Sequence, residues 1–331
     1  MTIKKKIKKL WLDGRLLCCL FFCSMLLCSC GGQETVNIRV GSLKGPTSMG
    51  ILFLMDKVEK GEINDSYEFQ MATGADELTA LLVKGELDIV LVPANVAAVL
   101  YWRTNGGVAV IDINTLGVLY IVTGNSNDIT SVEDLRGKTI YLTGKGTTPE
   151  ASLKYILQQN GLTETDYFLE YKSEATEVAA LLAENPSAIG LLPQPFATAA
   201  LVQNENLKIC LDMNEEWERV QSESSMVTGV TVVRREFLEE HETEVKAFLE
   251  EHSASVASIG EDISTGAVLA VQAGIVAKES IARQAIPQCN ITCITSEKMR
   301  EALSAYLKVL ADFDAELVGG ALPGEDFYYL P

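Results

Sequence analysis

Short apolar runs alternate along this chain with longer segments whose apolar residues recur every three or four positions. The short runs have the length of buried strands, and the longer segments have the period of helices that bury one face. In the first hundred residues the pattern predicts strands at 36–41, 67–72 and 88–92 and helices at 48–60, at 75–84 and from Asn95 onward. Strands and helices in this order predict a largely parallel sheet covered by helices.

The same pattern returns 100 residues later with related residues. Residues 75–82 and 175–182 share Ala, Glu, Ala, Leu and Leu at matched positions, and residues 88–93 and 188–193 share Ile, Leu and Pro. Unrelated α/β units can converge on such strings, but identities at one fixed offset favour an internal duplication. Because the period is too long for a solenoid and has the length of one α/β unit, we expect two lobes.

The repeated unit also indicates where a ligand would bind. Lys-Gly occurs at 44–45 and again at 145–146, each time after a predicted strand. Ligands of open parallel sheets bind beyond the carboxyl ends of the strands, so two facing lobes would bring both loops to one cleft. Strands at 118–123 and 226–233 are predicted to connect the lobes. The chain then divides into a signal segment at 1–29, lobe 1 at 30–119 and 226–331, and lobe 2 at 120–225.

The N-terminus has the order of a lipoprotein signal peptide. A lysine-rich start is followed by an apolar run at 16–27, which is shorter than the roughly 20 residues of a membrane-spanning helix. The run ends in Leu27, Cys28, Ser29 and Cys30, which resembles a bacterial lipobox with Cys30 as the lipidated residue. We therefore expect a lipid anchor on the extracytoplasmic face of the cell membrane. An ordinary secretory signal cleaved nearby is the alternative.

Charge and cysteine content exclude several classes of protein. The chain has a net charge of −18, and residues 1–29 carry +5, so the remainder carries −23. Such a polyanion does not bind nucleic acid by neutralising phosphates. Five of the eight cysteines lie at or before Cys30, which leaves Cys210, Cys289 and Cys293. Cys289 and Cys293 either form a disulfide or lie as two thiols beside a short strand, and their spacing predicts no metal site.

Catalytic residues are not evident in the sequence. His241 and His252 fall around the charged segment 239–251, where we expect both on a solvated helix surface. The chain has no Gly-x-Ser-x-Gly motif, no phosphate-binding loop and no His/Cys set with metal-ligand spacing. We therefore expect neither an enzyme nor a bound cofactor.

A series of motifs resembles one family over essentially the whole chain after Cys30. They include Gly-Pro-Thr-Ser-Met-Gly at 45–50 and Gly-Lys-Gly-Thr-Thr-Pro-Glu at 144–150, with others at 92–95, 134–138, 192–196, 319–323 and 327–329. The chain resembles the solute-binding lipoproteins of ABC importers in the nitrate/sulfonate/taurine and thiamine-precursor-binding superfamily. The resemblance implies a class 2 periplasmic-binding-protein fold, which is α/β with two Rossmann-like lobes and a two-strand hinge. It also implies capture of a small organic solute for ABC permease and ATPase subunits.

Two other functions fit the same resemblance. One is an enzyme of the thiamine-pyrimidine type, but the related enzymes carry a cysteine-rich motif and an active histidine that we do not find after Cys30. The other is a receptor or adhesion lipoprotein that works without an importer.

The candidate ligand-binding residues lie mainly in strand-to-helix loops. Thr47 or Ser48 is expected to cap a helix whose start can hold an anion, and Thr147 with Glu150 fits a capping box. The full set of candidates is Lys44, Gly45, Thr47, Ser48, Met49, Thr73, Gly74, Asn95, Gly146, Thr147, Thr148, Gln194 and Phe196.

Several of these residues have a structural alternative. Asn95 either binds the ligand or caps its helix. Gln194 lies between two prolines in a stiff turn that suits a binding site, and Phe196 either forms the floor of the pocket or belongs to the core. Trp217 and Trp102 are expected to pack helices.

The ligand is expected to be neutral or zwitterionic. No arginine lies in the candidate loops, and a compact dianion usually attracts several positive or N–H donors. The alternative is a sulfonate or nitrate-like anion that is held on backbone N–H groups with Lys44 or Lys145.

Overall fold

The structure is a computed structural model that describes residues 36–63 and 66–331. Residues 37–331 form one compact unit. The predicted signal peptide and Cys30 lie outside the described residues.

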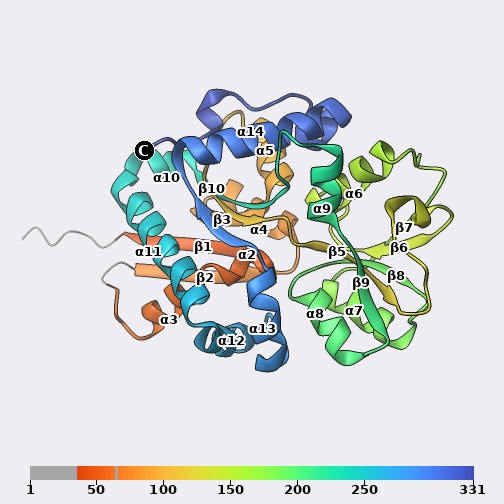
Figure 1. The fold of residues 1–331 in the computed structure, drawn as a ribbon. Helices are drawn as coiled ribbons and strands as arrows, with labels where there is room; N and C mark the ends of the chain where they lie inside the picture. The colour runs from red at the N-terminus through yellow and green to blue at the C-terminus, as the bar shows by residue number, and fades with distance from the viewer. Residues whose placement is uncertain (1–35, 64–65) are drawn as a thin grey trace, which may run out of the picture. The chain divides into compact units, whose positions relative to one another are not determined.

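The first of two sheets has six strands in the order β11-β4-β10-β3-β1-β2 (Figure 1). β1 lies parallel to both β2 and β3, whereas β10 runs antiparallel to β3 and β4. The strands are β1 (Asn37–Leu43), β2 (Ser66–Ala72), β3 (Ile89–Pro93), β4 (Val108–Leu116), β10 (Val227–Arg234) and β11 (Ile291–Ile294).

The second sheet has five strands in the order β7-β6-β8-β5-β9. β6 lies parallel to β7 and β8, and β5 runs antiparallel to β8 just as β10 does to β3. The strands are β5 (Leu119–Gly124), β6 (Thr139–Leu142), β7 (Phe168–Tyr171), β8 (Ile189–Pro193) and β9 (Leu207–Asp212).

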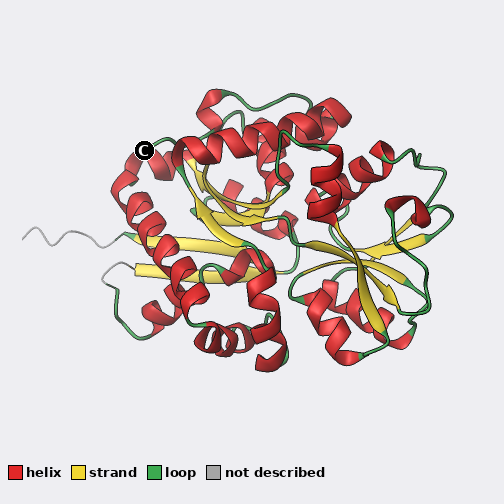
Figure 2. Cartoon of the chain, in the orientation of Figure 1, coloured by secondary structure: helices red, strands yellow, loops and turns green. Residues whose placement is uncertain are grey.

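Helices surround both sheets, as Figure 2 shows. The α-helices are α2 (Pro46–Met49), α3 (Leu52–Glu59), α4 (Ala75–Val83), α5 (Ala94–Arg103), α6 (Thr148–Gln159), α7 (Ala175–Glu184), α8 (Phe196–Gln203), α9 (Met213–Val220), α10 (Arg235–Glu240), α11 (Glu242–Glu261), α12 (Ile263–Gln272), α13 (Glu279–Ala285) and α14 (Ser296–Phe313). Short 3₁₀ helices are η1 (Val132–Leu135), η2 (Ile286–Gln288), η3 (Ala315–Val318) and η4 (Glu325–Phe327). In the described part of the chain no single helix is long and apolar enough to cross a membrane.

The predicted mixed α/β fold is confirmed, and the repeated strings occupy equivalent elements. α4 and α7 begin at Ala75 and Ala175, and β3 and β8 end at Pro93 and Pro193. All five residues of β3 are buried, as expected for a strand that is covered by helices on both faces. The predicted helix at 48–60 is instead two helices, α2 and α3. They are separated near Gly50, whose backbone packs so closely that a Cβ would lie 3.0 Å from His252 Nε2.

The chain passes between the sheets twice. It leaves β4 for β5 through Gly117 and Val118, and it returns from α9 to β10 through 221–226. We keep the name lobe 1 for the residues around the six-stranded sheet and lobe 2 for those around the five-stranded sheet. The exact division of the chain stays a prediction, because residues 37–331 form a single compact unit.

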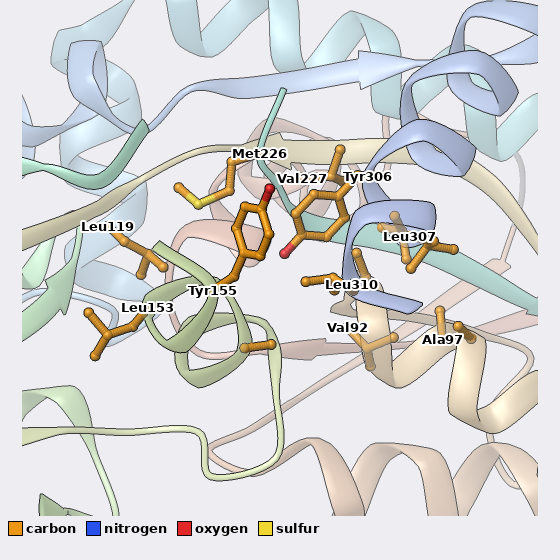
Figure 3. Close-up of a cluster of buried hydrophobic side chains, with 14 of the residues drawn as sticks. Val92, Ala97, Leu119, Leu153, Tyr155, Met226, Val227, Tyr306, Leu307 and Leu310 are labelled. Atoms are coloured by element: carbon orange, nitrogen blue, oxygen red, sulfur yellow. The ribbon is translucent and has the colours of Figure 1, made fainter. Parts of the chain in front are cut away.

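The main hydrophobic core continues from one lobe into the other. Trp217 of α9 is fully buried, with its ring centroid 4.9 Å from that of Tyr155 in α6 and 5.1 Å from that of Tyr306 in α14. Figure 3 shows Tyr155 and Tyr306 in this cluster. Trp217 therefore packs its helix onto lobe 2, as predicted, and also contacts lobe 1. Trp102 is 39% exposed, and its indole N–H donates to the carbonyl of Ala321.

The prediction of a solvated His252 is wrong. His252 is fully buried, and its Nδ1 lies 3.1 Å from Oδ2 of Asp112. The charged residues near it occupy the outer face of α11, whereas Phe248, His252 and Ser255 occupy the inner face. His241 lies at the junction of α10 and α11 and is partly exposed. Cys210, Cys289 and Cys293 are free thiols in the structure.

Candidate solute-binding site

A cavity of about 290 Å³ lies between the loops of the two lobes. Lobe 1 contributes the carboxyl ends of β1, β2 and β3, and lobe 2 contributes the carboxyl ends of β6, β7 and β8. Open parallel sheets bind ligands at these ends, because the loops there vary without disturbing the sheet. The volume is near the lower limit for small-molecule pockets and fits a small solute.

Each lobe supplies one lysine and one carboxylate to the wall of the cavity. Lys44 and Asp76 come from lobe 1, and Lys145 and Glu174 come from lobe 2. Lys145 Nζ also lies 5.4 Å from the centre of the Tyr171 ring. The charges of these four side chains cancel, so the wall is polar without favouring one sign of ligand charge.

The structure brings about half of the candidate binding residues to the cavity. Those that line it are Lys44, Gly45, Thr47, Thr73, Gly74, Thr147 and Phe196. Those that do not line it are Ser48, Met49, Asn95, Gly146, Thr148 and Gln194. The role of the lining residues in binding stays a prediction.

The expected helix cap at Thr47 or Ser48 is wrong. α2 has four residues and begins after Gly45, so both hydroxyls lie inside it. Thr47 Oγ1 donates to the carbonyl of Leu43 at 3.0 Å, and Ser48 Oγ donates to the same carbonyl. Met49 is fully buried in the core. Of these three residues only Thr47 reaches the cavity, because the short helix turns the other two inward.

The predicted capping box at Thr147 and Glu150 is also wrong. Thr147 precedes α6, but its hydroxyl donates to the carbonyl of Gly144 at 2.6 Å. Glu150 instead accepts the N–H of Gly146 at 2.6 Å and pairs with Lys154 at 3.0 Å. Burial works to raise the pKa of Glu150, but these two partners hold it below its ordinary value. Its charge is therefore used within the fold, away from the cavity wall.

Asn95 neither lines the cavity nor caps its helix. It is fully buried, and its amide donates to the carbonyls of Gly146 at 3.0 Å and Leu317 at 3.3 Å. Its Oδ1 accepts the hydroxyl of Thr148 at 3.2 Å. Asn95 thus links α5 of lobe 1 to the loop and first residue of α6 in lobe 2. Asn95, Gly146 and Thr148 were all predicted to bind the ligand, and all three take part in this link instead.

Gln194 has a similar internal role. Its amide nitrogen donates to Oε1 of Gln288 in lobe 1 at 3.0 Å. Its Oε1 accepts the N–H and the hydroxyl of Thr198, which lies in the first turn of α8. The stiff turn between the two prolines therefore presents the amide to the neighbouring lobe, and it does not face the cavity.

The sequence missed several lining residues of lobe 2. Ser173, Glu174 and Thr176 line the cavity at the start of α7. The offset of 100 residues would have located Ser173 and Glu174, because they correspond to the candidates Thr73 and Gly74, whereas Thr176 corresponds to Asp76, which was not a candidate. Asp76 follows in the same turn of lobe 1.

Thr228 was also missed, since it enters from β10 and lies outside the repeated loops. Its hydroxyl is buried and has no hydrogen-bond partner among the described residues. Because a buried hydroxyl without a hydrogen bond is unfavourable, Thr228 would be stabilised by a polar partner at the cavity wall.

Comparison with known proteins identifies related chains. Residues 55–254 match the family model described as ABC transporter, phosphonate, periplasmic substrate-binding protein. The search among curated proteins finds no match.

Solved structures show the same fold at low sequence identity. An ABC transporter protein from Parabacteroides distasonis has a TM-score of 0.73 and 23% identity, over 89% of this chain and 99% of that chain. The periplasmic aliphatic sulphonate binding protein of Escherichia coli has a TM-score of 0.72 and 15% identity, over 89% and 92%. The alkanesulfonate-binding protein from Xanthomonas axonopodis pv. citri, bound to MOPS, has a TM-score of 0.69 and 14% identity, over 88% and 96%. The fold of this chain is therefore that of periplasmic binding proteins.

Proposed function

The chain belongs to the family of phosphonate-type periplasmic substrate-binding proteins of ABC transporters, and we propose from this premise that it captures a small zwitterionic solute in the cavity between its lobes. As a member of the family it is a solute-binding component of an ABC importer. The chain then passes the solute to permease and ATPase subunits.

The main support for a zwitterionic solute is the presence of both lysines and carboxylates in the cavity wall. Lys44 and Lys145 suit an anionic group, and Asp76 and Glu174 suit an amine. A ligand with only an anionic group would leave two carboxylates beside it without partners, which opposes binding. A zwitterion satisfies both kinds of side chain.

Other lining residues supply the contacts that fix orientation. Thr47, Thr73 and Thr147 present hydroxyl groups, and Gly45 and Gly74 allow close approach of the backbone. Phe196 offers an apolar surface at 6% exposure. Polar groups at fixed positions beside apolar surface are typical of small-molecule sites.

Matched ligands test the proposal. We expect 2-aminoethylphosphonate to raise the thermal stability of the purified protein, by about 2.7 kcal/mol at 100 times its dissociation constant. Ethylphosphonate lacks the amine and ethylamine lacks the anion, so neither should stabilise the protein at the same concentration. Equal stabilisation by ethylphosphonate would show that the ligand does not need an amine and is not a zwitterion. If neither these nor a wider set of sulfonates, amino acids and pyrimidines stabilises the protein, solute capture in this cavity is wrong.

Charge-removing variants locate the two ends of the ligand. Lys44→Met and Lys145→Met should weaken binding of the anionic group, and Asp76→Asn and Glu174→Gln should weaken binding of the amine. Lys138→Met is the matched control, since Lys138 is exposed and lies outside the cavity lining. Calorimetric titration with the stabilising ligand measures each effect.

We also propose that the chain is not an enzyme. The matched family is one of binding proteins. A thiamine-pyrimidine-type enzyme needs a reactive histidine in its cleft, whereas neither His241 nor His252 is among the described residues that line the cavity. Independent receptor or adhesion activity is the other alternative, and a permease and an ATPase encoded beside this chain would argue against it.

We propose lipid attachment at Cys30 as the membrane anchor. The acyl chains would contribute about 0.8 kcal/mol per buried methylene and hold the binding unit near its importer. Cells supplied with an alkyne-tagged fatty acid should label the wild-type chain and the Cys28→Ser variant, but not Cys30→Ser. Equal labelling of Cys30→Ser would show that the lipidated residue lies elsewhere.

A further inference from the structure

Three side chains that commonly bind metals meet on one face of the six-stranded sheet. Asp112 lies in β4, Cys293 lies in the neighbouring strand β11, and His252 lies in α11, which packs against β11. None of the three is among the described residues that line the solute cavity. They therefore form a second polar cluster that solute capture leaves unexplained.

The cluster is compact and largely closed to water. One possible ligand atom from each residue lies within 4.8 Å of the other two, and no other such group of His, Cys, Asp and Glu occurs within 36–63 and 66–331. Asp112 and His252 are fully buried, whereas Cys293 is partly exposed. Cys293 is thus the most exposed member of the cluster.

Neighbouring residues hold the carboxylate and the imidazole in place. Nδ1 of His252 lies 3.1 Å from Oδ2 of Asp112, and the Thr231 hydroxyl donates to Oδ1 at 2.8 Å. The Thr231 hydroxyl is a partner of the kind that orients metal ligands in characterised sites. Nε2 of His252 faces the backbone of Gly50, where a Cβ would lie only 3.0 Å away, and it has no hydrogen-bond partner among the described residues. An ion would therefore bind at Nδ1, in place of the present contact between Nδ1 and the Asp112 carboxylate.

We propose that Asp112, His252 Nδ1 and Cys293 bind one zinc ion. Zinc accepts carboxylate, imidazole and thiolate ligands, and bond lengths of about 2.0–2.3 Å place its ligand atoms roughly 3.3–3.8 Å apart. Separations of up to 4.8 Å would shorten by about 1–1.5 Å at most, and the 3.1 Å between His252 Nδ1 and Asp112 Oδ2 would lengthen slightly. Calcium and magnesium prefer oxygen ligands and do not suit a sulfur and a nitrogen.

Charge balance makes this ion compatible with burial. A zinc ion carries +2, and the Asp112 carboxylate and a Cys293 thiolate carry −1 each, so the complex is neutral. Three protein ligands leave the fourth tetrahedral position for a water molecule on the exposed side of Cys293. Zinc would tie β4, β11 and α11 together within lobe 1.

Binding must release a proton from the thiol. A cysteine thiol has an ordinary pKa of about 8.5 and is therefore mostly protonated near neutral pH before a metal binds. Metal binding to a thiol displaces this proton and becomes stronger as pH rises. The sequence did not indicate this site, because its three residues lie at positions 112, 252 and 293.

Cobalt and zinc titrations of the full chain test the proposal. The metal-free protein, purified in detergent, is compared with Cys293→Ser, so that all other cysteines are identical. We expect wild type to bind one more equivalent of Co²⁺ than the variant, with thiolate-to-cobalt and tetrahedral cobalt absorption bands. Equimolar Zn²⁺ should raise the melting temperature of wild type only. Calorimetry in buffers of different ionisation enthalpy should show one additional proton released.

Cys210→Ser is the matched control, because Cys210 is a free and partly exposed thiol outside the cluster. It should keep the cobalt spectrum and the response to zinc. Cys293→Ala provides a second variant if the serine destabilises the fold. If Cys293→Ser binds Co²⁺ with the same spectrum and stoichiometry as wild type, Cys293 is not a metal ligand. The same conclusion follows if wild type and the variant bind equal amounts of metal.

Discussion

Among single residues, Asp88 shows how strongly one buried charge depends on its partners. It is 1% exposed and accepts bonds from the backbone and side chain of Arg39 and from the side chain of Arg234. Burial works to raise the pKa of Asp88, but the two arginines hold it below its ordinary value of 3.8. A lowered pKa means that the native state favours the ionised carboxylate, so its contribution is complete near neutral pH.

We predict that Asp88→Asn lowers the free energy of unfolding by about 3 kcal/mol at pH 7, since it leaves two arginines without their anion. The contribution of the ionised carboxylate is lost as pH falls through its lowered pKa. The difference between wild type and variant should therefore narrow below about pH 4. Urea unfolding at several pH values measures it. Asp128→Asn alters an exposed carboxylate and should change stability by no more than about 0.5 kcal/mol. If the difference in the free energy of unfolding between wild type and Asp88→Asn does not change with pH, the ionised Asp88 carboxylate is not the source of the stabilisation.

Residue types alone were a poor guide to which polar side chains face the solute cavity. Ser48, Asn95 and Gln194 have suitable hydroxyl or amide groups, yet each satisfies a partner inside the protein. Whether a polar group turns inward depends on loop conformation, which local sequence does not determine. His252 was wrongly predicted to be solvated for a related reason. Charged residues surround it in the sequence, although it lies on the buried face of its helix.

At the scale of elements, the pattern of apolar residues predicted most strands and helices of the repeated units. The offset of 100 residues relates α4 to α7 and β3 to β8, and it would have located Ser173 and Glu174 in the lining of lobe 2. Packing within the repeat still differs. Gly190 corresponds to Val90, but a Cβ at Gly190 would lie 2.8 Å from Leu182. Side chains of α7 therefore occupy the space that a valine at this position would need, and the pattern of apolar residues does not show such differences.

Pairings between distant elements were not accessible from the sequence. β11 joins the edge of the six-stranded sheet beside β4, with an irregular register between Ile291 and Ile294. This pairing, together with α11, places Cys293 near Asp112 and His252. Period and spacing describe neighbours along the chain, so a cluster made by three remote segments requires the tertiary fold.

For the whole molecule, the two lobes are joined by more than the two connecting segments. Tyr306 of lobe 1 is fully buried against Trp217 of lobe 2, and its hydroxyl lies 2.8 Å from that of Ser152. Asn95 and Gln194 add hydrogen bonds between the lobes. A shared core of this kind couples the unfolding of the lobes, so we expect one cooperative transition for residues 37–331.

Loss of the Tyr306 ring should weaken this coupling. We predict that Tyr306→Ala lowers the free energy of unfolding by about 3–5 kcal/mol, because it leaves a cavity between α14 and α9. Lobe 2 should then unfold separately, so calorimetry should show two transitions where wild type shows one. Phe248→Ala is the matched control, since Phe248 is equally buried but packs within lobe 1 against Tyr67 and His252. It should lower the melting temperature and keep a single transition. A single transition in both variants would show that the connecting segments and the polar contacts couple the lobes without Tyr306.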